Sequence, residues 1–168
     1  MDGIFECIVA RKTPAYAWPA KIGMSLFLTI TILATLIINP IFFVLTIGFG
    51  VFMYFMMPRF DLEWEYTFLD GELRIDKIFS QSSRKRFRVL LFDRIDAIAP
   101  IDNDEIRRNL NNPGFTKIDC SSQKGDTYGV YGILYSDEKS RQVILFEPDE
   151  KMLKALRRYS PRKVTTQI

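Results

Sequence analysis

Four closely spaced basic residues offer the most suggestive chemistry in this chain: Arg84, Lys85, Arg86 and Arg88. Clustered Lys and Arg side chains near an anionic membrane leaflet each contribute about 1 kcal/mol of attraction. An ordinary solvated loop is the simplest interpretation of the cluster, and contact with a protein partner is the third. The sequence therefore makes these residues candidates for contact with anionic lipid or a partner, and the three interpretations stay open. The same alternatives apply to a second basic group: Arg157, Arg158, Arg162 and Lys163.

An acidic run, Asp102-Asn103-Asp104-Glu105, begins like a calcium-binding loop but does not continue as one. Ile106 stands where the fifth-position ligand is needed, Arg107 replaces the sixth-position glycine, and Pro113 replaces the twelfth-position glutamate. Capping of a short helix over Asp102–Leu110 explains the acids better. No metal site is predicted.

The residue types give little support to catalysis. The chain contains no histidine, which removes the commonest general base and the commonest metal ligand. It has no G-x-S-x-G motif, no P-loop and no C-x-x-C motif. Cys7 and Cys120 lack metal-like spacing and are expected to be unpaired thiols in a reducing compartment. We therefore expect no enzyme and no cofactor.

The stretch Ile22–Met57 organises the rest of the chain, because its 36 residues include no Asp, Glu, Lys or Arg. As one helix it would measure about 54 Å, well beyond the roughly 30 Å hydrocarbon core of a bilayer. Asn39-Pro40 divides it into Ile22–Ile38 and Ile41–Met57, each about 25 Å long, since proline disfavours helix at the preceding residue. The sequence predicts a transmembrane helical hairpin, because a chain of 168 residues has too little other material to bury such a rod.

Positive charges flank the two outer ends of the predicted hairpin. Arg11, Lys12 and Lys21 precede the first span and Arg59 follows the second, whereas the Asn39-Pro40 turn carries none. By the positive-inside rule, both termini are expected in the cytoplasm, as parts of a two-span, multi-pass protein of the cell membrane. The absence of Asp, Glu, Lys and Arg within the spans argues against a transporter or channel.

Residues 1–21 are predicted to be an N-terminal interfacial segment. Its first apolar residues share one face of a short helix: Ile4, Phe5, Ile8 and Val9. Tyr16 and Trp18 lie among basic residues, a mixture that suits the membrane–water interface. An interfacial helix and a helix docked on the soluble domain are both compatible with this pattern.

Residues 60–163 are predicted to form a cytoplasmic domain. Charges in residues 59–168 nearly balance, with 20 Lys and Arg against 18 Asp and Glu, which argues against nucleic acid as a partner. Leu62–Phe68 alternates as a half-buried strand does, and Asp70-Gly71 is typical of a type I′ hairpin turn. Ser80–Arg86 is expected to be a polar loop. Further strands are expected over Glu72–Phe79, Phe87–Phe92, Ile95–Ile101, Phe115–Cys120, Thr127–Ser136 and Arg141–Glu147.

Pro148 is expected to begin a C-terminal helix, with Asp149 and Glu150 complementing its dipole and Pro161 ending it. Seven strands and a closing helix predict an α+β domain: a bent antiparallel barrel or sandwich, plugged by its last helix. Its core is expected to include six aromatic residues: Trp64, Tyr66, Phe68, Tyr128, Tyr131 and Tyr135.

This order of elements resembles the pleckstrin-homology (PH) fold, and specifically the PH-like domains found beside transmembrane helices in small bacterial proteins. Tyr66–Ile75 and Asp93–Ile98 carry that resemblance. The whole chain also resembles a bacterial family of two-span proteins of unknown function, in phrases such as Asp70–Ile78 and Phe146–Leu153. The lipid-binding motif of eukaryotic PH domains, with basic residues at the first hairpin, is not matched, because that turn is the tight Asp70-Gly71.

The resemblance implies a fold and brings no activity with it. The sequence predicts a membrane-anchored binding or scaffold module that engages a protein or anionic lipid at the cytoplasmic face. The alternative is a structural subunit of a larger integral-membrane complex. A membrane enzyme that uses carboxylates is a third hypothesis, and no carboxylate stands out in the sequence to carry it.

Overall fold

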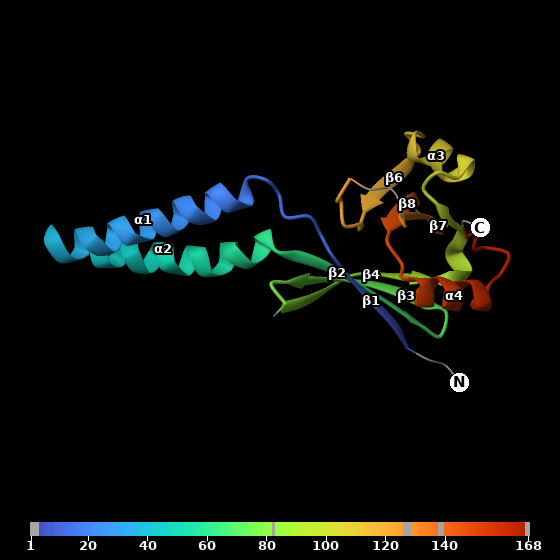
Figure 1. Cartoon of the computed structure of the whole chain (residues 1–168), viewed down its shortest axis with the longest axis horizontal. Coiled ribbons are helices and arrows are strands. Elements are labelled where there is room, and N and C mark those ends of the chain that lie inside the picture. Colours follow the sequence, from blue (N-terminus) through green and yellow to red (C-terminus); the bar gives the residue numbers. More distant parts are fainter. Residues whose placement is uncertain (1–3, 82, 126–128, 138–139, 167–168) are drawn as a thin grey trace. The chain divides into compact units, whose positions relative to one another are not determined.

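The structure is a computed structural model that describes residues 4–81, 83–125, 129–137 and 140–166. It divides into a helical unit, made of Thr13–Leu62 and Phe79–Ser83, and a sheet unit that contains the other described residues. In chain order (Figure 1) the elements are β1 (Phe5–Ala10), α1 (Ala17–Ile37), α2 (Phe42–Met56), the 3₁₀ turn η1 (Met57–Phe60), β2 (Leu62–Leu69), β3 (Glu72–Phe79), β4 (Ser83–Leu91), the 3₁₀ turn η2 (Phe92–Arg94), β5 (Ile95–Pro100), α3 (Asp104–Leu110), β6 (Phe115–Asp119), β7 (Tyr131–Asp137), β8 (Ser140–Phe146) and α4 (Glu150–Tyr159).

Two apolar helices make up most of the helical unit, and they separate where the sequence predicts. α1 ends at Ile37 and α2 begins at Phe42, on either side of Asn39-Pro40. α1 already begins at Ala17 instead of the predicted Ile22. α1, and α2 together with η1 (Phe42–Phe60), are long and apolar enough to cross a membrane, and only 6% of each apolar window is buried. That exposure differs from the core helix of a soluble protein, which hides its apolar surface.

Ring and hydroxyl contacts hold α1 and α2 together. The rings of Phe27 and Phe49 meet edge to face with their centroids 4.6 Å apart. Thr35 Oγ1 lies 3.3 Å from Thr46 Oγ1, so one hydroxyl donates to the other across the pair. The hydroxyls of Thr29 and Thr31 return to the backbone of their own helix, as predicted. Thr35 and Thr46 also have backbone acceptors within reach, but each hydroxyl has one proton, so the one that donates across the pair does not donate to its own backbone.

Replacing Thr35 by Val removes the interhelical hydrogen bond and preserves the shape of the side chain. We expect the helix pair to lose about 0.6 kcal/mol, the average for such bonds inside membrane proteins. Thermal unfolding of the full chain in detergent measures the loss. Thr29→Val is the matched control, because the described hydrogen bond of Thr29 goes to Ser25 O of its own helix. Equal losses in the two variants would contradict the interhelical role.

The described strands form two separate four-stranded sheets, so of the predicted alternatives, a barrel or a sandwich, the barrel is wrong. The first sheet has the order β1-β2-β3-β4 and the second the order β5-β7-β8-β6. β6 runs parallel to β8, whereas β5–β7 and β7–β8 are antiparallel, so the second sheet is mixed. Each of the seven strands predicted in residues 62–147 has a counterpart. The predicted strand start at Thr127, the aromatic Tyr128 and the middle of the 137–140 turn lie outside the described residues.

A short C-terminal segment explains why β4 and β5 do not join the sheets into a barrel. The backbone N–H of Ile98 in β5 donates to Lys163 O at 2.7 Å, and the N–H of Thr165 donates to Ile98 O at 2.8 Å. Val164 is buried and forms a parallel bridge with Ile98. The chain end therefore occupies the edge of β5 that a closed barrel would pair with another strand.

The helix predicted near the N-terminus is wrong, because Phe5–Ala10 forms strand β1. β1 pairs antiparallel with β2, with Cys7 opposite Tyr66 and Val9 opposite Trp64. Local periodicity placed its apolar residues on one face of a helix, but β2 offers a full row of backbone partners that local periodicity does not reveal. The start of the chain thus belongs to the sheet unit together with residues far along the sequence.

The main core of the sheet unit is made of inward-facing side chains from both sheets and from α4. Its fully buried side chains include Tyr66, Leu73, Ile75, Ile133, Ile144, Phe146, Met152 and Leu156. α4 begins two residues after the predicted Pro148, where Asp149 Oδ1 accepts a hydrogen bond from Met152 N at 2.7 Å. On the other face of the second sheet, α3 packs against β6, β7 and β8. A smaller cluster there includes Ala99, Ile106, Leu134 and Val143, so this sheet is covered on both faces.

The turn between β2 and β3 is the predicted tight hairpin turn. Asp70 and Gly71 have φ values of 48° and 79°, and positive φ at both central residues is what a type I′ turn requires. Gly71 O accepts a hydrogen bond from Phe92 N at 2.8 Å. A β-carbon added at Gly71 would also collide with the hydroxyl of Tyr159 from α4. The turn therefore fixes the register of the first sheet and seats the end of α4.

Replacing Gly71 by Ala should lower the free energy of unfolding of the sheet unit by about 1 kcal/mol, because an L-residue pays that cost in the left-handed region. Gly114→Ala is the control, since Gly114 has ordinary φ and an added β-carbon would lie 3.2 Å from Asn112 Oδ1, a side chain that can rotate. Urea unfolding of the full chain in mild detergent measures both. A loss at Gly114 as large as that at Gly71 would contradict the argument.

Candidate functional site

The predicted basic residues lie on an edge strand, and the loop predicted over Ser80–Arg86 is wrong. Ser80 and Gln81 have φ values of 45° and 56°, which turns the chain within fewer residues than expected. β4 begins at Ser83. It is the last strand in the order β1-β2-β3-β4, so it forms an edge of the first sheet. The polar composition suggested a loop, yet polar residues are common on an edge strand because one row of its backbone faces solvent.

Arg84 forms an ion pair with a buried carboxylate. Its Nη2 lies 2.8 Å from Glu65 Oε1, and the side chain of Glu65 is 2% exposed whereas that of Arg84 is 61% exposed. Burial raises the pKa of Glu65, Arg84 opposes that rise, and the carboxylates of Glu6 and Asp76 add to it. Glu65 Oε2 and Asp76 Oδ1 are buried and have no hydrogen-bond partner among the described residues.

The other candidates divide into two kinds. Arg88 is half-buried and its Nη1 donates to Gln142 Oε1 of β8 at 2.7 Å. Lys85 and Arg86 are exposed, and no ion pair is described for either. The four residues therefore do not form one free cluster, and their contact with lipid or a partner remains a prediction.

Two residues of the second basic group, Arg157 and Lys163, are tied to the chain itself. Lys163 Nζ donates to Phe92 O at 3.0 Å and to Asp93 O at 3.2 Å, which are carbonyls of the turn η2. Arg157 Nη1 donates to Thr166 Oγ1 at 2.9 Å. These contacts fasten the C-terminal segment onto the sheet unit, a role that a pattern of charges in the sequence does not reveal.

A cation between aromatic rings is the feature that sequence reasoning missed. Lys77 Nζ lies 5.0 Å from the centroid of the Trp64 ring and 4.0 Å from that of Phe87. The two rings meet edge to face at 5.3 Å. Arg88 Cζ lies 5.8 Å from the Phe87 centroid. We call Trp64, Lys77, Phe87 and Arg88 the cationic–aromatic cluster. The two-residue turn at Asp70-Gly71 was the available signal, because it places Lys77 opposite Trp64.

The buried tyrosine and cysteines have structural surroundings. Tyr66 Oη donates to Cys120 O at 2.6 Å and accepts from Glu147 N at 3.4 Å. Burial raises the pKa of Tyr66, and burial likewise raises the pKa of Cys120 to about 12. Both cysteines are free in the structure, as predicted, and burial also raises the pKa of Cys7. A thiol with a raised pKa is a poor nucleophile at neutral pH.

The acidic run caps a helix, as predicted. Asn103 Oδ1 accepts a hydrogen bond from Glu105 N at 2.9 Å, and Asp104 and Glu105 occupy the first turn of α3. Acids in a first turn are stabilised by the helix dipole. In the described part of the chain, no group of three or more His, Cys, Asp or Glu residues is arranged to hold a metal ion.

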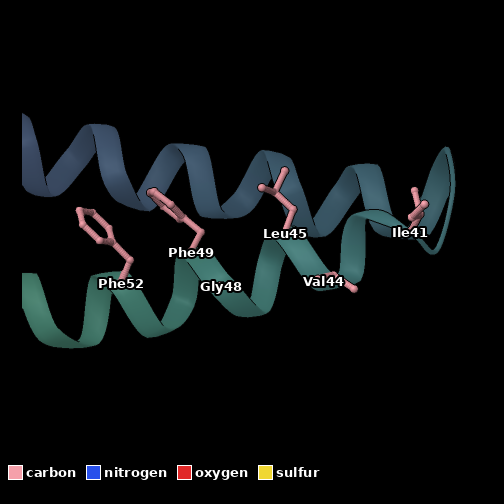
Figure 2. Close-up of a pocket in the computed structure, with 6 residues that line it drawn as sticks. All are labelled: Ile41, Val44, Leu45, Gly48, Phe49 and Phe52. Atoms are coloured by element: carbon pink, nitrogen blue, oxygen red, sulfur yellow. The ribbon is translucent and has the colours of Figure 1, made fainter.

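The helical unit carries an apolar groove along α2 (Figure 2). It has a volume of about 530 Å³ and is lined by Ile41, Val44, Leu45, Gly48, Phe49 and Phe52. In Figure 2, Leu45 and Phe49 extend toward α1, while Gly48 leaves the middle of the groove without a side chain. A β-carbon at Gly48 would meet no atom within 4 Å. An open surface with this lining suits hydrocarbon better than water.

Two sheets with a C-terminal helix and a cationic edge strand form a small module, and the apolar helix pair is inserted in it between β1 and β2. The chain belongs to the family described as bacterial PH-like domain (DUF6106), whose model matches residues 1–166. This confirms the family predicted from the sequence, and the function of that family is unknown. No curated protein and no solved structure matches the chain significantly.

Proposed function

We propose that this protein is a membrane-anchored binding or scaffold module. α1 and α2 cross the cell membrane as a two-span hairpin, and the PH-like domain recruits a protein or anionic lipid at the cytoplasmic face. The proposal needs no catalytic site, because restricting a domain to a surface raises its effective concentration for neighbouring partners.

The exposed apolar surface of the helix pair carries the proposal. Many large apolar side chains are exposed along both helices, including Leu36, Ile37 and Val44 at 74–79% exposure. Exposing such side chains to water costs about 1.5–3 kcal/mol each, whereas lipid tails cover them without cost. Under this proposal, acyl chains also fill the groove along α2.

The charges at the ends of the helix pair support one orientation. Lys21 Nζ lies 2.9 Å from Asp61 Oδ2, so an ion pair lies at the end of the pair that holds the start of α1. Tyr16 and Phe60 meet edge to face near the same end. Such a mixture suits headgroups, and the positive-inside rule places it in the cytoplasm with both termini. The uncharged Asn39-Pro40 turn then lies outside.

Membrane fractionation and cysteine labelling test the proposal together. In a Cys7→Ser background the buried Cys120 stays unreactive, and single cysteines at Asn39 and Asn112 report the turn and the PH-like domain, since both positions are exposed. We expect the chain to resist carbonate extraction. An impermeant maleimide should label N39C on intact cells, and N112C only after permeabilisation. Labelling of N112C from outside, or a soluble chain, would refute the proposal.

The alternative, a structural subunit of a larger integral-membrane complex, makes a different prediction. It requires the solubilised chain to co-purify at fixed stoichiometry with an integral-membrane partner after crosslinking. A binding module instead exchanges partners and can be recovered without one. Crosslinking followed by mass measurement of the intact complex separates the two.

A further inference from the structure

The cationic–aromatic cluster holds two positive charges for which no carboxylate partner is described. Lys77 contacts the rings of Trp64 and Phe87, and the only hydrogen bond described for Arg88 goes to a neutral amide, Gln142 Oε1. The indole Nε1 of Trp64, a residue 3% exposed, has no acceptor among the described residues. Trp64 Nε1 is therefore an exception among buried donors, which are normally satisfied, and it lies beside two cations for which no anion is described.

Two acids on the strands that carry the cluster, Glu65 and Asp76, belong to the opposite face of the first sheet. Successive residues of a strand point to opposite faces, so Glu65 and Asp76 lie away from Trp64 and Lys77, and Arg84 already pairs with Glu65. Both Lys77 and Arg88 lie close enough to the buried Cys120 to lower the pKa of its thiol slightly against the rise caused by burial. The two cations share the ring of Phe87. Asp119 also acts on the Cys120 thiol, but its carboxylate already accepts hydrogen bonds from Ser121 and Gln123, so we expect the anion for the two cations to come from outside the chain.

The edge of β4 leads directly into this cluster. β4 is the last strand of its sheet, and its residues Ser83, Arg84, Lys85 and Arg86 are all exposed before Phe87 and Arg88 turn toward other elements. An exposed edge offers a row of backbone donors and acceptors to an added strand. Lys85 and Arg86, for which no ion pair is described, repel a second copy of β4 and favour a negatively charged strand, whereas the charge of Arg84 is already paired with Glu65.

We propose that β4 binds an extended acidic segment of a partner protein, which pairs with the outer edge of β4 and presents a carboxylate to Lys77 and Arg88. The inference rests on the proposed function as a binding module and names the chemistry of its partner. Backbone pairing supplies a sequence-independent contact, and the carboxylate at the cluster supplies the selectivity.

The test uses the full chain in nanodiscs of neutral lipid and a fluorescent peptide of alternating Glu and Val. We expect binding by anisotropy, and slower amide exchange over residues 83–88. A matched peptide of alternating Lys and Val should bind at least tenfold more weakly. A Glu peptide in which every second residue is proline should also bind at least tenfold more weakly, because proline cannot donate a backbone hydrogen bond. We expect the affinity for the Glu–Val peptide to fall at least tenfold in two variants: Lys77→Gln, and the double variant Lys85→Glu with Arg86→Glu.

Arg107→Glu with Arg108→Glu is the matched control, because this adjacent basic pair is exposed on α3, which covers the second sheet. It should leave peptide affinity unchanged. Unchanged amide exchange in β7 and β8 shows that each variant is folded.

Three outcomes would overturn the inference. They are equal binding of the acidic and basic peptides, binding without protection of β4, and protection of β4 without peptide in a second set of nanodiscs that contain anionic lipid. The last outcome would make a lipid surface the occupant. A chain that inserts in the membrane with the expected topology but binds no acidic peptide refutes this inference alone and leaves the membrane anchor standing.

Discussion

Replacing Arg84 by Gln is expected to lower the free energy of unfolding of the PH-like domain by about 2 kcal/mol at pH 8. Removing one partner of a fully buried ion pair costs roughly 3–5 kcal/mol, because the remaining charge is left without compensation. Glu65 is buried, but water reaches Arg84, which is 61% exposed, so the cost here should fall below that range. The carboxylate of Glu65 would then face only the like charges of Glu6 and Asp76.

The loss should depend on pH in a defined direction. Burial raises the pKa of Glu65 above its ordinary value of 4.5, so the folded state holds the proton more tightly than the unfolded state does. The stability that Glu65 contributes is complete below that ordinary value and is lost as pH rises through the raised pKa. The positive charge of Arg84 stabilises only the ionised form of Glu65. Wild type and variant should therefore be equally stable near pH 4 and diverge as pH rises.

Urea unfolding of the full chain in mild detergent, followed by the fluorescence of Trp64 in a Trp18→Phe background, measures this difference. Glu65→Gln removes the buried charge and should cost less than Arg84→Gln. In the Glu65→Gln background, Arg84→Gln should cost under about 0.5 kcal/mol, as a surface substitution does. Lys85→Gln, one residue along and exposed, is the control for charge alone. An effect of Arg84→Gln that is independent of pH and of Glu65 would contradict the ion-pair argument.

Most elements were predictable because their signals are local. The uncharged stretch with Asn39-Pro40 at its middle specifies two helices, and the type I′ turn at Asp70-Gly71 specifies both the first hairpin and its register. The acids before α3 and α4 mark helix starts, and both helices begin within two residues of the expected positions. In each case a few neighbouring residues determine the backbone conformation, so no knowledge of distant contacts is needed.

The errors arose where distant partners decide the structure. Phe5–Ala10 becomes a strand because β2 supplies its hydrogen bonds from more than fifty residues away. The sheets remain separate because Val164, near the chain end, takes the free edge of β5. β6 runs parallel to β8. The segment that connects these two strands, which includes β7, follows β6 in the sequence and determines that pairing. Periodicity reports which face of an element is apolar, and it carries no information about which strand lies beside it.

The candidate site shows the same division. The sequence indicated that Arg84, Lys85, Arg86 and Arg88 were basic and close, and their spacing suggested one loop. In the structure, Arg84 forms an ion pair with Glu65, and Arg88 donates a hydrogen bond to Gln142. Of the four residues, only Lys85 and Arg86 are exposed without a described ion pair. Partners on other strands determine whether a charge is available for binding. A count of basic residues therefore overestimates the positive surface that a ligand can reach.

Replacing Gly132 by Ala is expected to cost about 2 kcal/mol, because α3 lies directly on β7 at this point. A β-carbon there would lie 2.5 Å from Ile106 Cγ2 and 3.1 Å from its Cδ1, and Ile106 is fully buried. Side chains in a packed core cannot move aside freely, and overpacking costs roughly 1–3 kcal/mol. The glycine thus sets how closely the helix can approach the sheet.

A compensating substitution makes this prediction specific. Ile106→Leu removes the γ2 methyl that collides with the added β-carbon while it keeps the side-chain volume. By itself it should cost under about 1.5 kcal/mol, as volume-conserving swaps do. Combined with Gly132→Ala it should recover about half of the loss, measured by the same Trp64 unfolding transition. If the two losses simply added, the clash with Ile106 would not be the cause, because independent sites are additive and sites in contact are not.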